Sequence, residues 1–287
     1  MSCELCGFTG EPVVIWDKNE RDKKGILYSK VIRDENGNMV NAVNVICPVC
    51  GLVYTVPKTD RCKDFYKKEY REEYGFDIEA ESNHAHNAFD VLYSRKFLCV
   101  PFLDVGASTG ELVNIVRKLS KDKSNAVGID ASHENESVTK VDLMDYNPDM
   151  KFRCVTMLNT LEHMYSPVEA LNKVYDLTDE KAVLLVSVPD LLNTCINKTM
   201  DAFLSNAHLY NFTADSLFPL LVKCGFRPVD ITIIPEEIGF KLYAVALKDK
   251  PKEPKYKKPN IDLIKRLLII ANDLFLTKYT IMEGDAK

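Results

Sequence analysis

The segment Asp104–Gly110 combines a carboxylate with small residues in an order that suits ligand binding. An apolar run, 99–103, comes directly before it, and an amphipathic run, 111–119, comes directly after it. Glycine lets the backbone turn sharply and approach a ligand closely, and the first turn of a helix offers N–H groups to a ligand. A strand, a glycine turn and a helix in this order predict a cradle for a small molecule, although an ordinary strand-to-helix turn has the same glycines.

A further carboxylate, Asp130, ends the apolar run 126–129. An acidic residue at the tip of the second strand, about 20 residues beyond the glycine turn, can accept hydrogen bonds from ribose hydroxyls. This spacing favours a ligand that contains a nucleoside. Asp104 and Glu111 at the mouth of the turn would repel a pyrophosphate but suit a ligand with a cationic sulfonium and an amino group. They favour S-adenosylmethionine over a nicotinamide dinucleotide.

Three stretches then resemble class I S-adenosylmethionine-dependent methyltransferases. Leu103–Gly110 resembles motif I, usually Leu-Asp-x-Gly-x-Gly-x-Gly, with Ser108 in place of the middle glycine. Val127–Ser132 resembles the second-strand motif, and 160–171 resembles the Leu-Glu-His stretch with its later proline and leucine. With this resemblance, the expected cofactor-binding residues are Asp104, Gly106, Ala107, Ser108, Gly110, Asp130, Ala131, Asp142, Leu143, Asn159 and Tyr70.

Two of these residues have an alternative interpretation. The resemblance implies that Asp142 and Leu143 hold the adenine, whereas Asp142 could equally be a solvent-exposed loop acid. Tyr66, Tyr70 and Tyr74 lie on one face of a predicted helix, which is typical of a packing stripe. The resemblance implies that one of them, Tyr70, reaches the cofactor or the substrate.

Four of the nine cysteines form two Cys-x-x-Cys-Gly pairs, Cys3 with Cys6 and Cys47 with Cys50. Two-residue spacing lets both thiolates of a pair face one metal, and four thiolates close a tetrahedral structural zinc site. Iron in a rubredoxin-like site is the alternative. The strand-like runs 13–16, 26–33 and 39–46, with a hairpin signal at Asn36-Gly37, predict a zinc ribbon. We expect the other five cysteines to be ordinary buried or surface thiols.

The N-terminal part resembles one branch of these methyltransferases, in which a zinc-knuckle domain precedes the catalytic domain in surface-polysaccharide and sugar-modifying pathways. In that branch a Phe-Tyr-x-x-x-Tyr helix, here from Phe65, joins the two domains and covers the cofactor pocket. Residues 1–60 carry seven basic and eight acidic side chains. A nucleic-acid ribbon would present a basic face, so this balance makes nucleic acid an improbable partner.

Three residues are candidates for catalysis: His208, His163 and Tyr210. The run 208–213 resembles the family's His-x-Tyr-x-Phe-Thr signature, which faces the acceptor. Histidine titrates near neutrality and can deprotonate a hydroxyl or an acidic carbon, and we favour His208 over His163 as this base. A loop anchor is the alternative for His208. We expect His84, His86 and His133 to be ordinary surface or loop residues.

Alternating strand and helix patterns predict a Rossmann-like α/β class I methyltransferase sheet, mostly parallel with an antiparallel closing hairpin. The predicted strands are 100–105, 126–130, 137–141, 152–157, 182–188, 229–234 and 240–247, and the predicted helices are 84–97, 110–120, 167–176 and 213–224. The domains follow as a zinc ribbon at 1–60, a helical lid at 61–98, the methyltransferase domain at 99–247, a Lys/Pro-rich solvated linker at 248–260 and an amphipathic C-terminal helix at 261–278.

Composition sets broad limits. The 287 residues carry a net charge of −5, which gives no general attraction to nucleic acid or anionic membranes. The sequence contains no signal-peptide pattern and no apolar run long enough to span a bilayer, so we expect a cytoplasmic protein. The C-terminal helix could dock on its own domain, pair with a second copy or a partner protein, or lie on a membrane surface.

The sequence therefore predicts methyl transfer from S-adenosylmethionine to a sugar, nucleotide-sugar or glycan-type acceptor, on oxygen or carbon. One alternative is an RNA or protein methyltransferase that docks through its zinc ribbon. Another is a non-catalytic assembly factor that has kept the methyltransferase fold and binds a partner.

Overall fold

The computed structural model describes residues 2–17, 43–58, 60–69, 75–193, 200–204, 207–236 and 239–284. The predicted strand 26–33, the hairpin signal at 36–37, the first part of 39–46 and the tyrosines at 70 and 74 lie outside these ranges.

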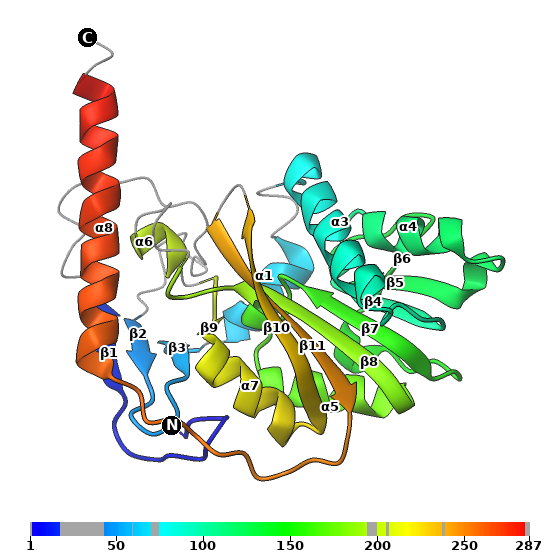
Figure 1. The fold of residues 1–287 in the computed structure, drawn as a ribbon, viewed down its shortest axis with the longest axis horizontal. Helices are drawn as coiled ribbons and strands as arrows, with labels where there is room; N and C mark the ends of the chain where they lie inside the picture. Colours follow the sequence, from blue (N-terminus) through cyan, green and yellow to red (C-terminus); the bar gives the residue numbers. More distant parts are fainter. Residues whose placement is uncertain are drawn as a thin grey trace.

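A seven-stranded sheet forms the centre of the molecule (Figure 1). Its order is β10-β11-β8-β7-β4-β5-β6, in which β11 runs antiparallel to both of its neighbours and the other neighbouring pairs are parallel. The strands are β4 (Phe102–Val105), β5 (Ala126–Asp130), β6 (Val138–Lys140), β7 (Phe152–Leu158), β8 (Thr178–Pro189), β10 (Phe226–Glu236) and β11 (Gly239–Lys248). The predicted parallel sheet with an antiparallel closing hairpin is confirmed.

Helices cover both faces of this sheet, α3 (Ile78–Ser94) and α4 (Glu111–Leu119) on one, α5 (Pro167–Leu177) and α7 (Ala214–Lys223) on the other (Figure 1). The side chains of a strand alternate between the faces. Accordingly, Phe102 packs with the α3 and α4 residues, whereas Leu103 and Val105 pack with those of α5 and α7. The sheet is therefore buried on both faces, which explains its nearly continuous apolar strands.

The structure changes the bounds of two predicted helices: α3 ends at Ser94 rather than at residue 97, and the C-terminal helix continues to Gly284 rather than ending at residue 278. Helix α3 begins at Ile78 rather than at residue 84, because the side chain of Asp77 accepts a hydrogen bond from Ala80 N (3.1 Å) and caps the first turn. The earlier start adds two acidic residues, Glu79 and Glu81, to the N-terminal turn. Since the N-terminal turn carries positive partial charge, these carboxylates stabilise it.

A second, four-stranded sheet contains β1 (Val13–Asp17), β2 (Val43–Ile46), β3 (Val53–Val56) and β9 (Tyr210–Asn211), in that order. The first three strands come from the predicted zinc ribbon. Strand β9 comes from the segment that follows β8 by sequence, and it pairs antiparallel with β3. The N-terminal module is therefore extended by a strand of the part that contains the large sheet.

The C-terminal helix α8 (Ile261–Gly284) follows an irregular segment and lies beside β1 and the short helix α6 (Met200–Phe203) (Figure 1). Leu268 is buried against a cluster that contains Trp16 and Met200, so self-docking occurs on this face. The opposite face exposes apolar residues, namely Leu263, Leu267, Ile270 and Leu274. Among the described residues, no helix combines the length and the apolar character needed to cross a membrane.

The linker before α8 is less solvated than predicted. It forms no helix or strand, but Pro254 is buried and Tyr256 Oη donates a hydrogen bond to the carbonyl oxygen of Leu5 (2.9 Å). These contacts attach the linker to the N-terminal module, so that α8 begins beside the surface on which it packs.

Candidate active site

A cavity of about 850 Å³ opens at the carboxyl ends of β4, β5 and β7. Ligands of open α/β sheets bind at this edge. The cavity lining includes Asp104, Gly106, Ala107, Ser108, Asp130, Ala131, Asp142, Leu143, Asn159, His163 and His208. Gly110 and Tyr210 are not among the lining residues, and Tyr70 lies outside the described part of the chain. Helix α1 (Asp60–Lys68) contributes Cys62 and Lys67 to the wall.

The glycine turn after β4 is held close to the sheet. Gly106 N and Ala107 N donate hydrogen bonds to the carbonyl oxygen of Ile129 (2.8 and 3.0 Å). Gly106 has a φ of +74°, and a Cβ atom there would lie 2.3 Å from Thr160 Oγ1. A side chain at this position would therefore both strain the backbone and displace Thr160, so the turn requires glycine.

Ser108, which replaces the middle glycine of motif I, adopts the left-handed conformation with a φ of 49°. Its Oγ donates a hydrogen bond to Glu81 Oε2 on α3 (2.7 Å). Ser108 thus keeps the backbone shape of the turn and links it to the helix above the cavity.

Asp130 is fixed by hydrogen bonds from the protein. One carboxylate oxygen accepts from Ser132 N (2.8 Å) and Ser132 Oγ (2.7 Å), and the other accepts from Ser108 N (3.1 Å). The carboxylate therefore ties the glycine turn to the end of β5 while it lines the cavity. The oxygen that accepts from Ser108 N alone can accept a further hydrogen bond, so the group remains able to bind a ribose hydroxyl.

Asp104 lies deeper. Its Oδ1 accepts a hydrogen bond from Thr156 Oγ1 (2.6 Å) on β7. Burial raises the pKa of Asp104 to about 7, and the nearby charge of Asp130 adds to the shift, while the Thr156 hydrogen bond opposes it. A cationic ligand in the cavity would stabilise the ionised form of this carboxyl.

Asp142 caps a short helix and also lines the cavity. Its carboxylate accepts a hydrogen bond from Met144 N (2.8 Å) and caps the short 3-10 helix η4 (Leu143–Asp145). The other oxygen pairs with Lys67 Nζ of α1 (3.0 Å), and the side chain lines the cavity. Asp142 therefore joins α1 to the cavity wall beside Leu143.

A polar network in the cavity wall includes a histidine that we expected to be an ordinary surface or loop residue. Asn159, with a φ of 47°, accepts a hydrogen bond from Lys241 Nζ (2.8 Å), and its amide nitrogen lies 2.7 Å from His84 Nδ1. Because an amide nitrogen only donates, Nδ1 accepts and Nε2 carries the hydrogen that points to the carboxylate of Glu236. His84 is thus a cavity residue, and its earlier assignment was wrong.

Glu236, the last residue of β10 in the closing hairpin, holds His84 in place. Burial alone would raise the pKa of Glu236, but hydrogen bonds from His84, Tyr243 and Asn87 outweigh it and lower the pKa. His84, Glu236 and Lys241 come from three separate elements. Their contact depends on the folded topology, so no local motif could reveal it.

Three further side chains lie together beside this network. The potential ligand atoms of Glu162, His163 and His208 all lie within 4.8 Å of one another. His163 Nδ1 lies 3.0 Å from the carbonyl oxygen of Ala207, and the two imidazole centroids are 5.0 Å apart. Burial raises the pKa of Glu162 to about 7, and the positive charge of Lys241 opposes that shift. The two predicted catalytic histidines are therefore brought together.

Tyr210, the third predicted catalytic residue, lies elsewhere. Its side chain is only 2% exposed, and its hydroxyl donates a hydrogen bond to Glu4 Oε1 (2.7 Å) and accepts one from Lys58 Nζ (2.6 Å). Burial and the charge of Glu4 raise the pKa of this phenol. The structure places Tyr210 at the contact with the N-terminal module rather than in the cavity.

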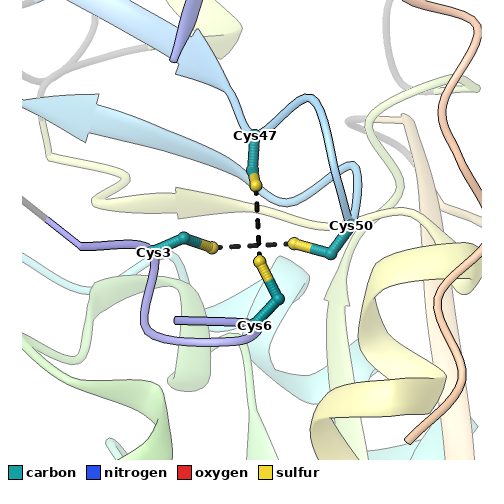
Figure 2. A group of neighbouring side chains, drawn as sticks. All are labelled: Cys3, Cys6, Cys47 and Cys50. Carbon is teal, nitrogen blue, oxygen red and sulfur yellow. Dashed lines mark hydrogen bonds between the residues drawn. The ribbon is translucent and has the colours of Figure 1, made fainter. Parts of the chain in front are cut away.

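The four predicted cysteine ligands converge on one point (Figure 2). Cys3 Sγ lies 3.6 Å from Cys50 Sγ, and Cys6 Sγ lies 3.5 Å from Cys47 Sγ. These separations are far longer than a disulfide bond and match thiolates that each lie about 2.3 Å from a shared tetrahedral ion. The glycine after each pair, Gly7 or Gly51, has a positive φ and closes the turn on the first cysteine. The cluster fits a metal.

The central part of the chain is similar to a known protein family. Residues 100–231 match the family model described as a methyltransferase domain. This region is similar to a methyltransferase domain. The match agrees with the predicted methyltransferase activity. No curated protein sequence matches the chain.

Solved structures of methyltransferases are similar to this chain, and the first of them agrees with the fold. The 1,6-didemethyltoxoflavin-N1-methyltransferase of Burkholderia thailandensis, with bound 1,6-didemethyltoxoflavin and S-adenosylhomocysteine, is 16% identical with a TM-score of 0.53 over 72% of this chain and 96% of that chain. The magnesium protoporphyrin IX methyltransferase of Synechocystis PCC 6803, with bound S-adenosylmethionine, is 14% identical with a TM-score of 0.48 over 67% of this chain and 99% of that chain. At these identities, the first similarity concerns the fold alone.

Proposed function

We propose that the methyltransferase domain transfers the methyl group of S-adenosylmethionine to a sugar, nucleotide-sugar or glycan-type acceptor, on oxygen or carbon. The observation that carries the proposal is the arrangement of one cavity. The carboxylates of Asp104 and Asp130 line its donor end, and the histidine pair His163 and His208 lines the same cavity. Both reacting molecules can therefore meet in one cavity.

The donor end suits the chemistry of S-adenosylmethionine. Asp130 is positioned to accept hydrogen bonds from the ribose hydroxyls, and Asp104 supplies negative charge for the sulfonium and amino groups. Methyl transfer demands mainly that nucleophile, methyl carbon and sulfur be aligned and that water be excluded, because the sulfonium is already a strong electrophile.

The acceptor end supports a polar substrate. Asn159, His84 and Lys241 form a connected network of hydrogen-bonding side chains there, and His163 and His208 lie close by. Such groups can bind the several hydroxyls of a sugar. We propose that His208 activates the acceptor oxygen or carbon, and that His163 positions the same group.

We further propose that the four-cysteine site binds zinc and serves a structural role. Four thiolates occupy all coordination positions of a tetrahedral ion, so no position remains for a substrate. The link between this site and catalysis is mechanical, because β3 of the ribbon pairs with β9, the strand that follows His208.

Incubation of the purified chain with methyl-labelled S-adenosylmethionine and separate panels of nucleotide-sugars, glycans, RNA and peptides tests the proposal. We expect label to enter a sugar-containing acceptor. His208→Ala should reduce turnover strongly while S-adenosylmethionine affinity remains as in the wild type, and His86→Ala, on the exposed side of α3, is the matched control. Label in RNA or peptide alone would overturn the acceptor class, and normal turnover by His208→Ala would make this histidine a loop anchor.

A further inference from the structure

We infer that Glu162, His163 and His208 form a second metal site, distinct from the four-cysteine site, that binds a divalent cation in the cavity. Glu162 and His163 come from the 3-10 helix η5 (Leu161–His163), which follows β7. His208 comes from the segment before β9. Their ligand atoms lie within 4.8 Å of one another.

The orientation of His163 is that of a metal ligand. Its Nδ1 lies 3.0 Å from the carbonyl oxygen of Ala207, and because a carbonyl only accepts, Nδ1 carries the hydrogen. The lone pair is then on Nε2, the nitrogen nearer to Glu162. Histidines that bind metals usually donate their other N–H to a carbonyl or carboxylate in this way, which fixes the tautomer and the ring.

The separation of His163 and Glu162 also suits a shared ion. His163 Nε2 lies 3.9 Å from Glu162 Oε1, which is too long for a hydrogen bond. Two bonds of about 2.0–2.2 Å to one ion would span this separation.

Glu162 supplies an independent observation. Its side chain is 1% exposed, and within the described part of the chain its Oε2 has no hydrogen-bond partner. A buried carboxylate oxygen without a partner is costly unless a cation neutralises it. Lys241 contributes positive charge nearby, and its Nζ hydrogen-bonds to Asn159 Oδ1. An ion between Glu162 and the histidines would coordinate the carboxylate directly.

The donor set indicates the kind of ion. Two imidazoles and one carboxylate favour Zn²⁺, Mn²⁺, Fe²⁺ or Co²⁺ over Ca²⁺ and Mg²⁺, which prefer oxygen ligands alone. Three protein ligands leave coordination positions open toward the cavity. This part of the inference rests on the proposed function: the open positions would take oxygen atoms of the acceptor. His208 would then activate the acceptor through the ion it holds, since a bound cation lowers the pKa of a coordinated hydroxyl.

Mn²⁺ is a suitable probe, because its hard character directs it away from a zinc-loaded site of four thiolates. We would titrate Mn²⁺ into the full chain with the four-cysteine site filled by zinc and follow the spectrum of unbound Mn²⁺ by electron paramagnetic resonance. The wild type should bind Mn²⁺, and Glu162→Gln and His163→Gln should lower the affinity about tenfold or more. His86→Gln, the matched control, should bind as the wild type does. Equal binding by the wild type and Glu162→Gln, or no binding, would overturn the site.

A measurement on the wild type keeps the test independent of variant folding. Pulsed electron paramagnetic resonance of bound Mn²⁺ should detect coupling to imidazole nitrogen, and its absence would overturn the site. Calorimetric titration with S-adenosylmethionine separates the two proposals. If the protein binds the cofactor but no nitrogen-coordinated Mn²⁺, the second metal site is overturned and the proposed function stands. If it binds nitrogen-coordinated Mn²⁺ but no cofactor, the proposed function is overturned and the metal site stands.

Discussion

Asp104 and Asp130 line the same cavity but have different surroundings. Asp130 accepts hydrogen bonds from two backbone amides and a hydroxyl, whereas Asp104 is buried with a hydrogen bond from Thr156. Burial raises the pKa of Asp104 to about 7. In the ligand-free protein, the stability associated with this group is full below the unfolded pKa and is lost as the pH rises through about 7.

Cofactor affinity should follow the opposite trend. The positive sulfonium favours ionised Asp104, so we expect the affinity for S-adenosylmethionine to increase between about pH 6 and pH 8. Calorimetric titration at several pH values measures this dependence. Asp104→Asn should flatten it, and S-adenosylhomocysteine, which lacks the sulfonium charge, should show a weaker dependence with the wild type. A steep rise that persists in Asp104→Asn would exclude Asp104 as the titrating group.

The sequence predicts some of the residues that line the cavity and misses others. Asp104, Gly106 and Asp130 lie in short motifs whose spacing reflects one strand-turn-helix unit, and all three line the cavity. His84 and Glu236 meet only because α3 packs across the ends of strands remote in sequence. Tyr210 shares a motif with His208, yet its hydroxyl contacts Glu4 because β9 pairs with β3, and this tertiary contact is not contained in the motif.

Among the elements, α8 shows what an amphipathic pattern does and does not determine. The sequence predicts the helix and its apolar residues but allows several docking partners. The structure buries one side against the N-terminal module and α6, and leaves Leu263, Leu267, Ile270 and Leu274 exposed on the other. The docking surface could not be predicted, because it includes residues of α6 and β1 that only the tertiary fold brings together.

Two leucines on this helix form a matched pair for a stability test. Leu268 is 0% exposed and Leu274 is 65% exposed. Leu268→Ala should lower the free energy of unfolding by about 2–5 kcal/mol, because it removes buried methyl groups and leaves a cavity. Leu274→Ala should change it by less than about 0.5 kcal/mol. Chemical denaturation measures both, and equal small effects would mean that α8 does not dock as described.

Across the whole molecule, the N-terminal module and the methyltransferase domain share one core. Cys3, Leu5 and Cys47 belong to the same buried cluster as Leu171 and Leu217 of the larger domain. The sequence predicts the two units from their separate motifs. Their contact could not be predicted, because strand β9 has only two residues and joins the ribbon through the tertiary fold.

Because of this continuity, we expect the N-terminal module to affect activity. Thr55 N donates a hydrogen bond to the carbonyl oxygen of Leu209 (2.9 Å), and Thr55 Oγ1 donates one to that of His208 (2.7 Å). We expect Cys47→Ser to lose the bound metal and to reduce turnover, because the ribbon would no longer support the His208 segment. Metal analysis and a turnover assay measure both effects. Cys99→Ser, outside the module, should retain both, and full turnover by metal-free Cys47→Ser would contradict the coupling.

The central claim is that the cavity binds S-adenosylmethionine through the turn at Asp104–Gly110 and the carboxylate of Asp130. Calorimetric titration of the cofactor into wild type, Asp130→Ala and Asp149→Ala tests it most directly, since Asp149 is exposed and lies outside the cavity lining. We predict saturable binding to the wild type and Asp149→Ala, and binding to Asp130→Ala that is weaker by about 1–3 kcal/mol, or roughly 5- to 150-fold. Absence of binding to the wild type, or equal affinity in all three proteins, would contradict the account.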